Sequence, residues 1–186
     1  MATHGILVPE AIAATNVDSF NRSAQYSGSS VDNGNVFQLA SKVGTSGSGT
    51  EVFVVSAPAT GSLAGLWMAY ESWENVLTDS KYRGLDPDPK NFFIKQNEVF
   101  SAFKPQVGDV ILATAEALTG TKSTNEYVVA TNGALQLNWS ATSIEGLTFK
   151  LLGSKYISLP NSSASTIDNQ RVTAYELMCI INDFEA

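Results

Sequence analysis

The sequence contains one cysteine and one histidine in 186 residues. With Cys179 alone, no disulfide can form within the chain, which is typical of proteins that fold in a reducing cytoplasm. His4 belongs to a segment without regular periodicity, so a catalytic triad would depend on a residue without rigid support. The sequence has no histidine and cysteine cluster for zinc, no phosphate-binding loop and no dinucleotide-binding glycine pattern. It therefore predicts no enzyme, no metal and no cofactor.

Positive charge is also scarce. Eleven Lys and Arg stand against eighteen Asp and Glu, giving a formal charge of -7 and a pI near 4.6. Such a field repels phosphate backbones and anionic lipids. No apolar run is long enough for a signal peptide or a membrane span, since Ile6 to Val8 is far too short. We therefore expect neither nucleic acid nor membrane as a partner.

Charged residues of either sign make up only 16% of the chain, below the roughly 25% of ordinary soluble domains. Ser, Thr, Asn and Gly take their place, and such a neutral polar surface suits lasting contact with neighbouring molecules. The length and the apolar content of 44% are typical of one domain with its own core.

Residues 1–34 are poor in periodicity, and we expect them to form an extended N-terminal arm ahead of a β domain over residues 35–186. Isolated apolar residues would anchor this arm on its own domain or on a neighbouring subunit. These apolar residues include Ile6, Leu7, Val8, Phe20 and Tyr26.

The segment Val99 to Ala141 carries the densest strand signals and predicts the core of the domain. The Gly108-Asp109 pair precedes the β-branched run that begins at Val110, as expected for a tight turn that enters a strand. Farther on, Asn132-Gly133 separates two apolar runs and is a strong hairpin signal.

Other strands are predicted on both sides of that segment. The expected strands are Val36–Leu39 paired with Glu51–Val55 as a hairpin, then Leu66–Tyr70, Leu147–Leu152, Tyr156–Leu159 and Arg171–Ile181. In the last strand the better core face is Thr173, Tyr175, Leu177, Cys179 and Ile181. About eight short strands separated by Gly, Pro and Asn predict a mainly β fold, a single barrel or sandwich.

Residues 74–95 predict a long ordered loop, because Pro87 and Pro89 cannot donate hydrogen bonds to a sheet. Asp86 and Asp88 in this loop are oxygen ligands of the type that calcium prefers, but the EF-hand glycine and terminal glutamate are missing. A structural proline turn is the favoured interpretation.

Acidic and aromatic residues gather around this loop, which is also the composition of a sugar-binding or sugar-cleaving site. The acids are Glu71, Glu74, Asp79, Asp86 and Asp88, and the aromatics are Trp67, Tyr70, Trp73 and Tyr82. Spacing alone does not place two carboxyls across a sugar, so a solvated acidic loop is preferred. For the aromatics we prefer a role in the core or at a subunit interface. For Cys179 we prefer a small buried apolar residue.

Five phrases of the sequence resemble the small structural proteins that tailed bacteriophages use alongside the major capsid protein. They are GILVPEAIAATNVDSFNRSAQYSG, VDNGNVFQLAS, LWMAYES, YRGLDPDPKNF and FSAFKPQVGDVI. Together they cover most of the chain, and they look most like a capsid decoration, or cement, protein.

This resemblance implies a virion protein without catalytic residues that binds the outer surface of an assembled capsid after synthesis in the host cytoplasm. Its partners would be the major capsid protein and sibling copies of itself, for example in a trimer. Residues 2–26 and 74–95 are then the expected contact segments. The candidate contact residues are Ile6, Leu7, Val8, Phe20, Tyr26, Tyr82, Arg83 and Phe92.

Three alternatives stay open at this point. A carbohydrate- or receptor-binding module would expose Trp67 or Trp73. A carboxylate-dependent glycan hydrolase would need Glu71 or Glu74 for turnover. The third alternative is another structural role in the same virion, in the tail or in completing the head.

Overall fold

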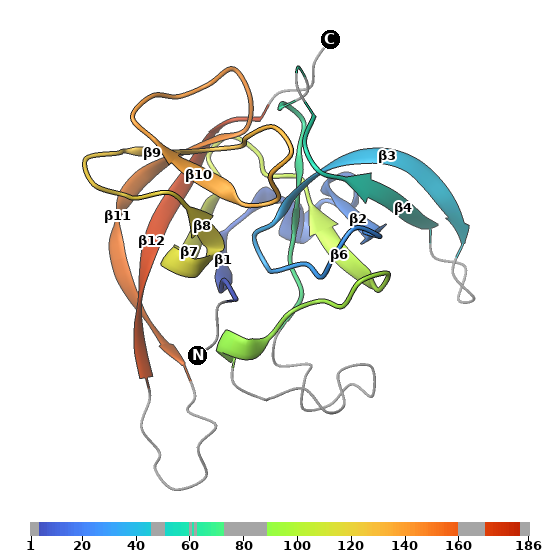
Figure 1. The fold of residues 1–186 in the computed structure, drawn as a ribbon, viewed down its shortest axis with the longest axis horizontal. Coiled ribbons are helices and arrows are strands. Elements are labelled where there is room, and N and C mark those ends of the chain that lie inside the picture. The colour runs from blue at the N-terminus through green and yellow to red at the C-terminus, as the bar shows by residue number, and fades with distance from the viewer. Residues whose placement is uncertain are drawn as a thin grey trace, which may run out of the picture.

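The computed structural model describes residues 4–45, 51–59, 61, 63–72, 89–159 and 170–182. Within these ranges the chain has twelve strands and short 3-10 turns but no α-helix. The strands form a closed barrel and a separate seven-stranded sheet, which lie against each other (Figure 1). The predicted mainly β fold with a barrel is confirmed.

Five strands close the barrel in the order β2-β4-β3-β5-β6. β2 pairs in parallel with β4 and antiparallel with β6, and these pairings close the ring. The strands are β2 (Asn21–Gln25), β3 (Val36–Thr45), β4 (Glu51–Ser56), β5 (Trp67–Ala69) and β6 (Val99–Phe103). The predicted hairpin of residues 36–39 with 51–55 is confirmed by the antiparallel pairing of β3 with β4, and the strand predicted at Leu66–Tyr70 is β5.

The second sheet has the order β1-β7-β12-β11-β9-β10-β8. Its strands are β1 (Leu7–Ala11), β7 (Val110–Thr114), β8 (Leu118–Thr119), β9 (Tyr127–Val129), β10 (Leu137–Ser140), β11 (Thr148–Leu159) and β12 (Gln170–Ile181). β11 and β12 form a long antiparallel hairpin that extends beyond the other strands (Figure 1).

Two details of this sheet differ from the sequence prediction. The runs 147–152 and 156–159 belong to one strand, because Gly153 sits at a β-bulge that keeps β11 paired with β12. In β12, Leu177 and Cys179 are fully buried as predicted, but Thr173 is exposed and Ala174 of the other parity is buried.

The segment Val99 to Ala141 crosses from one sheet to the other. It supplies β6 to the barrel and β7 to β10 to the seven-stranded sheet. β9 and β10 pair antiparallel around a turn at Asn132-Gly133, where Gly133 adopts the left-handed conformation with φ of 73°, but residues 130–136 make the connection longer than the tight hairpin predicted. The segment is thus core, as predicted, but it is shared between the two sheets.

The described part of the predicted arm, residues 4–34, is built into the fold. Leu7 pairs with Ala113 in the seven-stranded sheet, and Ala24 pairs with Phe100 in the barrel. A Cβ atom on Gly5 would lie closer to Ala117 than van der Waals contact allows. The boundary expected at residue 34 therefore separates no folding units, because the apolar anchors of this segment find partners in their own chain.

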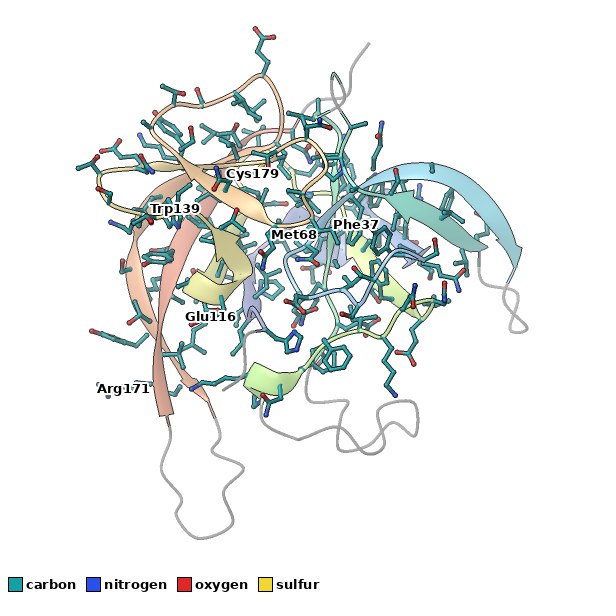
Figure 2. The ribbon with its side chains drawn as sticks, viewed as in Figure 1. Phe37, Met68, Glu116, Trp139, Arg171 and Cys179 are labelled. Atoms are coloured by element: carbon teal, nitrogen blue, oxygen red, sulfur yellow. The ribbon has the colours of Figure 1, made fainter. Side chains whose placement is uncertain are left out.

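One apolar core joins the barrel to the sheet. It contains Met68 and Phe103 from the barrel together with Ile111, Phe149 and Leu177 from the sheet. In Figure 2, Met68 lies between the two sheets, with Phe37 on the barrel side and Cys179 and Trp139 on the other. A second cluster, which includes Phe37 and Phe100, fills the barrel. Most of the buried apolar surface thus depends on the two sheets staying together.

Asn182, at the end of β12, adds a polar link across this junction. Its buried side-chain amide donates hydrogen bonds to the carbonyls of Leu66, at 3.0 Å, and Pro105, at 2.9 Å. Its oxygen accepts the Leu66 N–H at 3.0 Å. Leu66 precedes β5 and Pro105 follows β6, so one side chain fastens the seven-stranded sheet to two barrel strands.

The Asn182→Asp substitution tests this link. A carboxylate keeps the acceptor for the Leu66 N–H but cannot donate to the two carbonyls, which are then left unsatisfied. We expect a loss of about 2–4 kcal/mol in the free energy of unfolding, measured by urea denaturation at pH 7. Asn132→Asp, at an exposed turn, is the matched control and should change stability by less than ~0.5 kcal/mol. Equal effects of the two changes would contradict the proposed role of Asn182.

Candidate functional site

A partly open groove lies where β1 of the sheet approaches β6 of the barrel, and it has a volume of about 390 Å³. We call it the β1–β6 groove. Its lining is mostly apolar and consists of Val8, Pro9, Ile12, Thr15, Asn21, Tyr70, Ser101, Ala102 and Phe103. Such a cavity is at the lower end of the size range of small-ligand sites. Both sheets contribute, so the groove exists only in the assembled fold.

Local sequence explains how one wall of the groove forms. β1 is an edge strand that pairs with β7 alone, and its register shifts between Pro9 and Ala11. Proline has no N–H to donate, so it is tolerated at such an edge. After β1 the chain makes two 3-10 turns, η1 (Ala13–Asn16) and η2 (Asp18–Phe20). The Asn21 side chain donates to the carbonyls of Ala14 and Val17 and closes this turn.

The opposite wall is fixed by a network around Glu71. The Asn33 side chain bonds both backbone groups of Glu71, each at 2.8 Å. The Glu71 carboxylate accepts the Ser101 N–H at 2.8 Å and the Ser101 hydroxyl at 3.3 Å. Glu71 is one of the acids that a glycan hydrolase would need, but in this structure its carboxylate is bonded to Ser101 of β6. The other four acids, Glu74, Asp79, Asp86 and Asp88, lie outside the described residues.

A second cavity, of about 310 Å³, contains His4 and Asp32. His4 Nδ1 donates to Asp32 Oδ1 at 2.7 Å, and the imidazole stacks on Phe93 with 4.9 Å between ring centroids. The expectation that His4 lacks rigid support is therefore wrong. Sequence reasoning missed the pair because Asp32 stood out only as a turn residue, 28 positions away.

The predicted contact residues do not form one surface. Ile6, Leu7 and Phe92 are 4%, 1% and 3% exposed, so their side chains are used within this chain's own core. Three more, Val8, Phe20 and Tyr26, are half-buried, and of these only Val8 lines the β1–β6 groove. Tyr82 and Arg83 lie outside the described residues.

The aromatic residues that a sugar-binding site would use lie in different places. Trp67 is 4% exposed, packs in the barrel core and has the Arg22 guanidinium 5.5 Å from the centre of its ring. The prediction that it serves the core is confirmed. Tyr70 is half-buried and lines the β1–β6 groove, whereas Trp73 lies outside the described residues. Cys179 is fully buried, as predicted.

Comparisons with known proteins give no further guide to the site. No protein family model, no curated protein and no solved structure matches this chain. Among the described residues, no three His, Cys, Asp or Glu side chains converge as they would around a metal ion. The same part of the chain contains no helix with the length and apolar character needed to cross a membrane.

Close to the groove, Lys155 of β11 ties the long hairpin to the first strand. Its ammonium group lies 2.8 Å from Glu10 of β1 and 2.7 Å from Glu176 of β12. The hydrogen bond to Glu10, and then the one to Glu176, raises the pKa of Lys155 above its ordinary value of 10.5. Because Glu10 adjoins Pro9, this ion triad also helps to position the groove-lining part of β1.

Lys155→Met tests the contribution of the triad through its pH dependence. The pKa is raised in the folded state, so the stabilisation is complete well below pH 10.5 and is lost as the pH rises through the folded-state pKa. We therefore expect a small stability difference between wild type and variant at pH 7 that decreases as the pH rises above 10.5 and through the folded-state pKa, as measured by urea unfolding. A difference that stays constant over this range would show that packing of the lysine stem, and not its charge, matters.

Proposed function

We propose that this chain is a non-enzymatic decoration protein of a tailed bacteriophage, which binds the outer surface of the assembled head and strengthens contacts between major capsid subunits. Three observations support the proposal: the resemblance in sequence, the acidic chain that disfavours nucleic acid, and the rigid β body with a groove at its junction. In this function the major capsid protein is the partner, and the virion exterior is the location.

The β1–β6 groove is the observation that carries the proposal. It offers a mostly apolar surface at the edge of β1, with Thr15 exposed at its rim. Both walls are held by hydrogen bonds within the chain, through Asn21 on one side and Glu71 on the other. A preformed groove binds at a lower entropic cost than a segment that must order on binding. We assign it to a surface loop of the major capsid protein that inserts apolar side chains.

The mechanism is stabilisation by mass action. A protein that binds the assembled shell, and not dispersed subunits, shifts the equilibrium toward the closed particle by RT ln(1 + [L]/Kd). At a free concentration 100 times Kd this amounts to about 2.7 kcal/mol per site. Many sites per particle make a modest affinity sufficient.

Thr15→Arg tests the groove. The exposed position tolerates a large side chain, but the added length and charge obstruct the apolar lining. We expect at least about a tenfold weaker binding to purified bare shells, since a buried unpaired charge disfavours the complex by more than ~1.4 kcal/mol. Binding is measured by co-sedimentation and by occupancy in cryo-electron microscopy.

Thr142→Arg is the matched control, because it adds the same charge at an exposed loop position outside the groove lining. Its binding should equal that of wild type. Equal occupancy of both variants would remove the groove from the interface. Density on the tail, or at the head-to-tail junction, would favour the tail or head-completion alternative over decoration.

Deletion of residues 2–26 is not a clean test of contact by this segment. It would remove β1 and β2, which belong to the sheet and to the barrel, respectively. Loss of binding by this deletion variant would then reflect unfolding of the protein, and not the loss of a contact with the capsid. Point changes at exposed groove positions avoid this problem.

A carbohydrate-binding role has less support. Trp67, one of the two tryptophans that it would expose, lies in the barrel core. Soluble glycans should therefore leave tryptophan fluorescence unchanged, and saturable quenching would revive that alternative.

A further inference from the structure

Among the described strands, none pairs with the outer edge of β11 along its distal half. β9 pairs with residues 148–150, and the Leu151 N–H donates to the carbonyl of Glu126 at 2.8 Å. Beyond that point, residues 152–159 pair on their inner side with β12, and no described strand lies on their outer side. Figure 1 shows this half of the hairpin extending away from the rest of the molecule.

This edge lacks the devices that usually prevent strand addition. Natural edge strands carry proline, charged side chains (especially lysine) or bulges. Residues 152–159 contain no proline, and their one charge, Lys155, is already engaged by Glu10 and Glu176. The only bulge lies at the start of the segment, between Leu151 and Gly153, where β9 also ends. Strand addition is therefore blocked near β9 and open beyond it.

Two large apolar side chains of this segment are exposed. Tyr156 is 71% exposed and Leu152 is 49% exposed, which places both among the few large apolar side chains at the described surface. Ser154, between them, is also exposed. Alternate residues of a strand share a face, so Ser154 and Tyr156 lie on one face of the hairpin, whereas Leu152 lies at the bulge, where the alternation is broken.

We propose that β11 pairs antiparallel, edge to edge, with β11 of a second copy of this chain, about a two-fold axis that passes through Tyr156. This register places Tyr156 opposite the same residue of the second copy and Ser154 opposite its Ser158. It uses residues 153–159, which is the length left open by β9 and the bulge. The two seven-stranded sheets become one continuous sheet.

Charge and geometry are compatible with this occupant and rule out one neighbouring register. A two-fold axis keeps each face of the sheet on the same side, so only residues of like parity can oppose each other. The neighbouring symmetric register, centred on Lys155, would place two lysines directly opposite each other, which is unfavourable. With the axis at Tyr156, Lys155 faces Ile157 of the second copy, and no like charges face each other. The strand can therefore pair with its own copy in this register without placing like charges opposite each other.

The size of the contact sets its strength. Stable interfaces use roughly 20–30 residues a side, and this one uses only a short strand from each copy. We therefore expect a weak dimer in solution, with Kd on the order of 10–1,000 μM, held by backbone hydrogen bonds and a tyrosine pair. The proposal concerns isolated protein and goes beyond the proposed function, so it can fail while capsid binding holds, or the reverse.

Cysteine cross-linking in the full chain tests the register. Directly opposed residues have Cβ atoms about 4.5–5.5 Å apart, close enough for a disulfide after small adjustment. Tyr156→Cys alone should form covalent dimers under mild oxidation. Ser154→Cys and Ser158→Cys should each cross-link poorly alone but efficiently when mixed. Wild type, whose Cys179 is buried, and Thr173→Cys, exposed on β12, are the controls and should stay monomeric.

Sedimentation equilibrium tests the association itself. Wild type should dimerise with rising concentration, and Tyr156→Lys, which opposes two lysines at the axis, should weaken the dimer at least tenfold with unchanged thermal unfolding. Wild type that is monomeric at about 1 mM would overturn the proposal. Cross-linking of Ser154→Cys with itself, in place of the mixed pair, would overturn the register. Cross-linking to capsid protein alone would assign the edge to that partner instead.

Discussion

The fold depends on one apolar core that neither sheet could bury alone. Met68 and Phe103 of the barrel pack in one buried cluster with Phe149 and Leu177 of the seven-stranded sheet. An open sheet with one face exposed to water would present a large apolar surface, so the barrel acts as its cover. Asn182 reinforces the same junction with three buried hydrogen bonds.

This junction also explains why the surface features of interest lie where they do. The β1–β6 groove lies at the margin of this junction, because its lining combines the edge strand β1 with β6 of the barrel. The long hairpin projects because β11 and β12 continue past β9 and β7, which cover only part of their length. The fold thus presents two separate surface features, one a groove and the other an exposed strand edge.

Sequence patterns predicted local structure well and long-range partners poorly. The turn at Asn132-Gly133 and the strands around it follow from short-range chemistry, which a window of a few residues contains. The partners of residues 4–34 cannot be predicted in this way, because isolated apolar residues such as Leu7 carry no information about what they will contact. The same limit hid the pairing of His4 with Asp32. It also hid the role of Glu71, whose carboxylate serves backbone groups that sequence cannot place.

The order of strands has a consequence for how the chain acquires its structure. β12 follows every other described strand in sequence, yet it lies in the interior of its sheet between β7 and β11. β1 cannot pair until β7 has been synthesised, and β2 cannot pair until β4 and β6 have been synthesised. Contacts over such distances close slowly, and incomplete sheets expose their edges meanwhile. A nascent chain of this protein therefore cannot complete the seven-stranded sheet until β12 has left the ribosome.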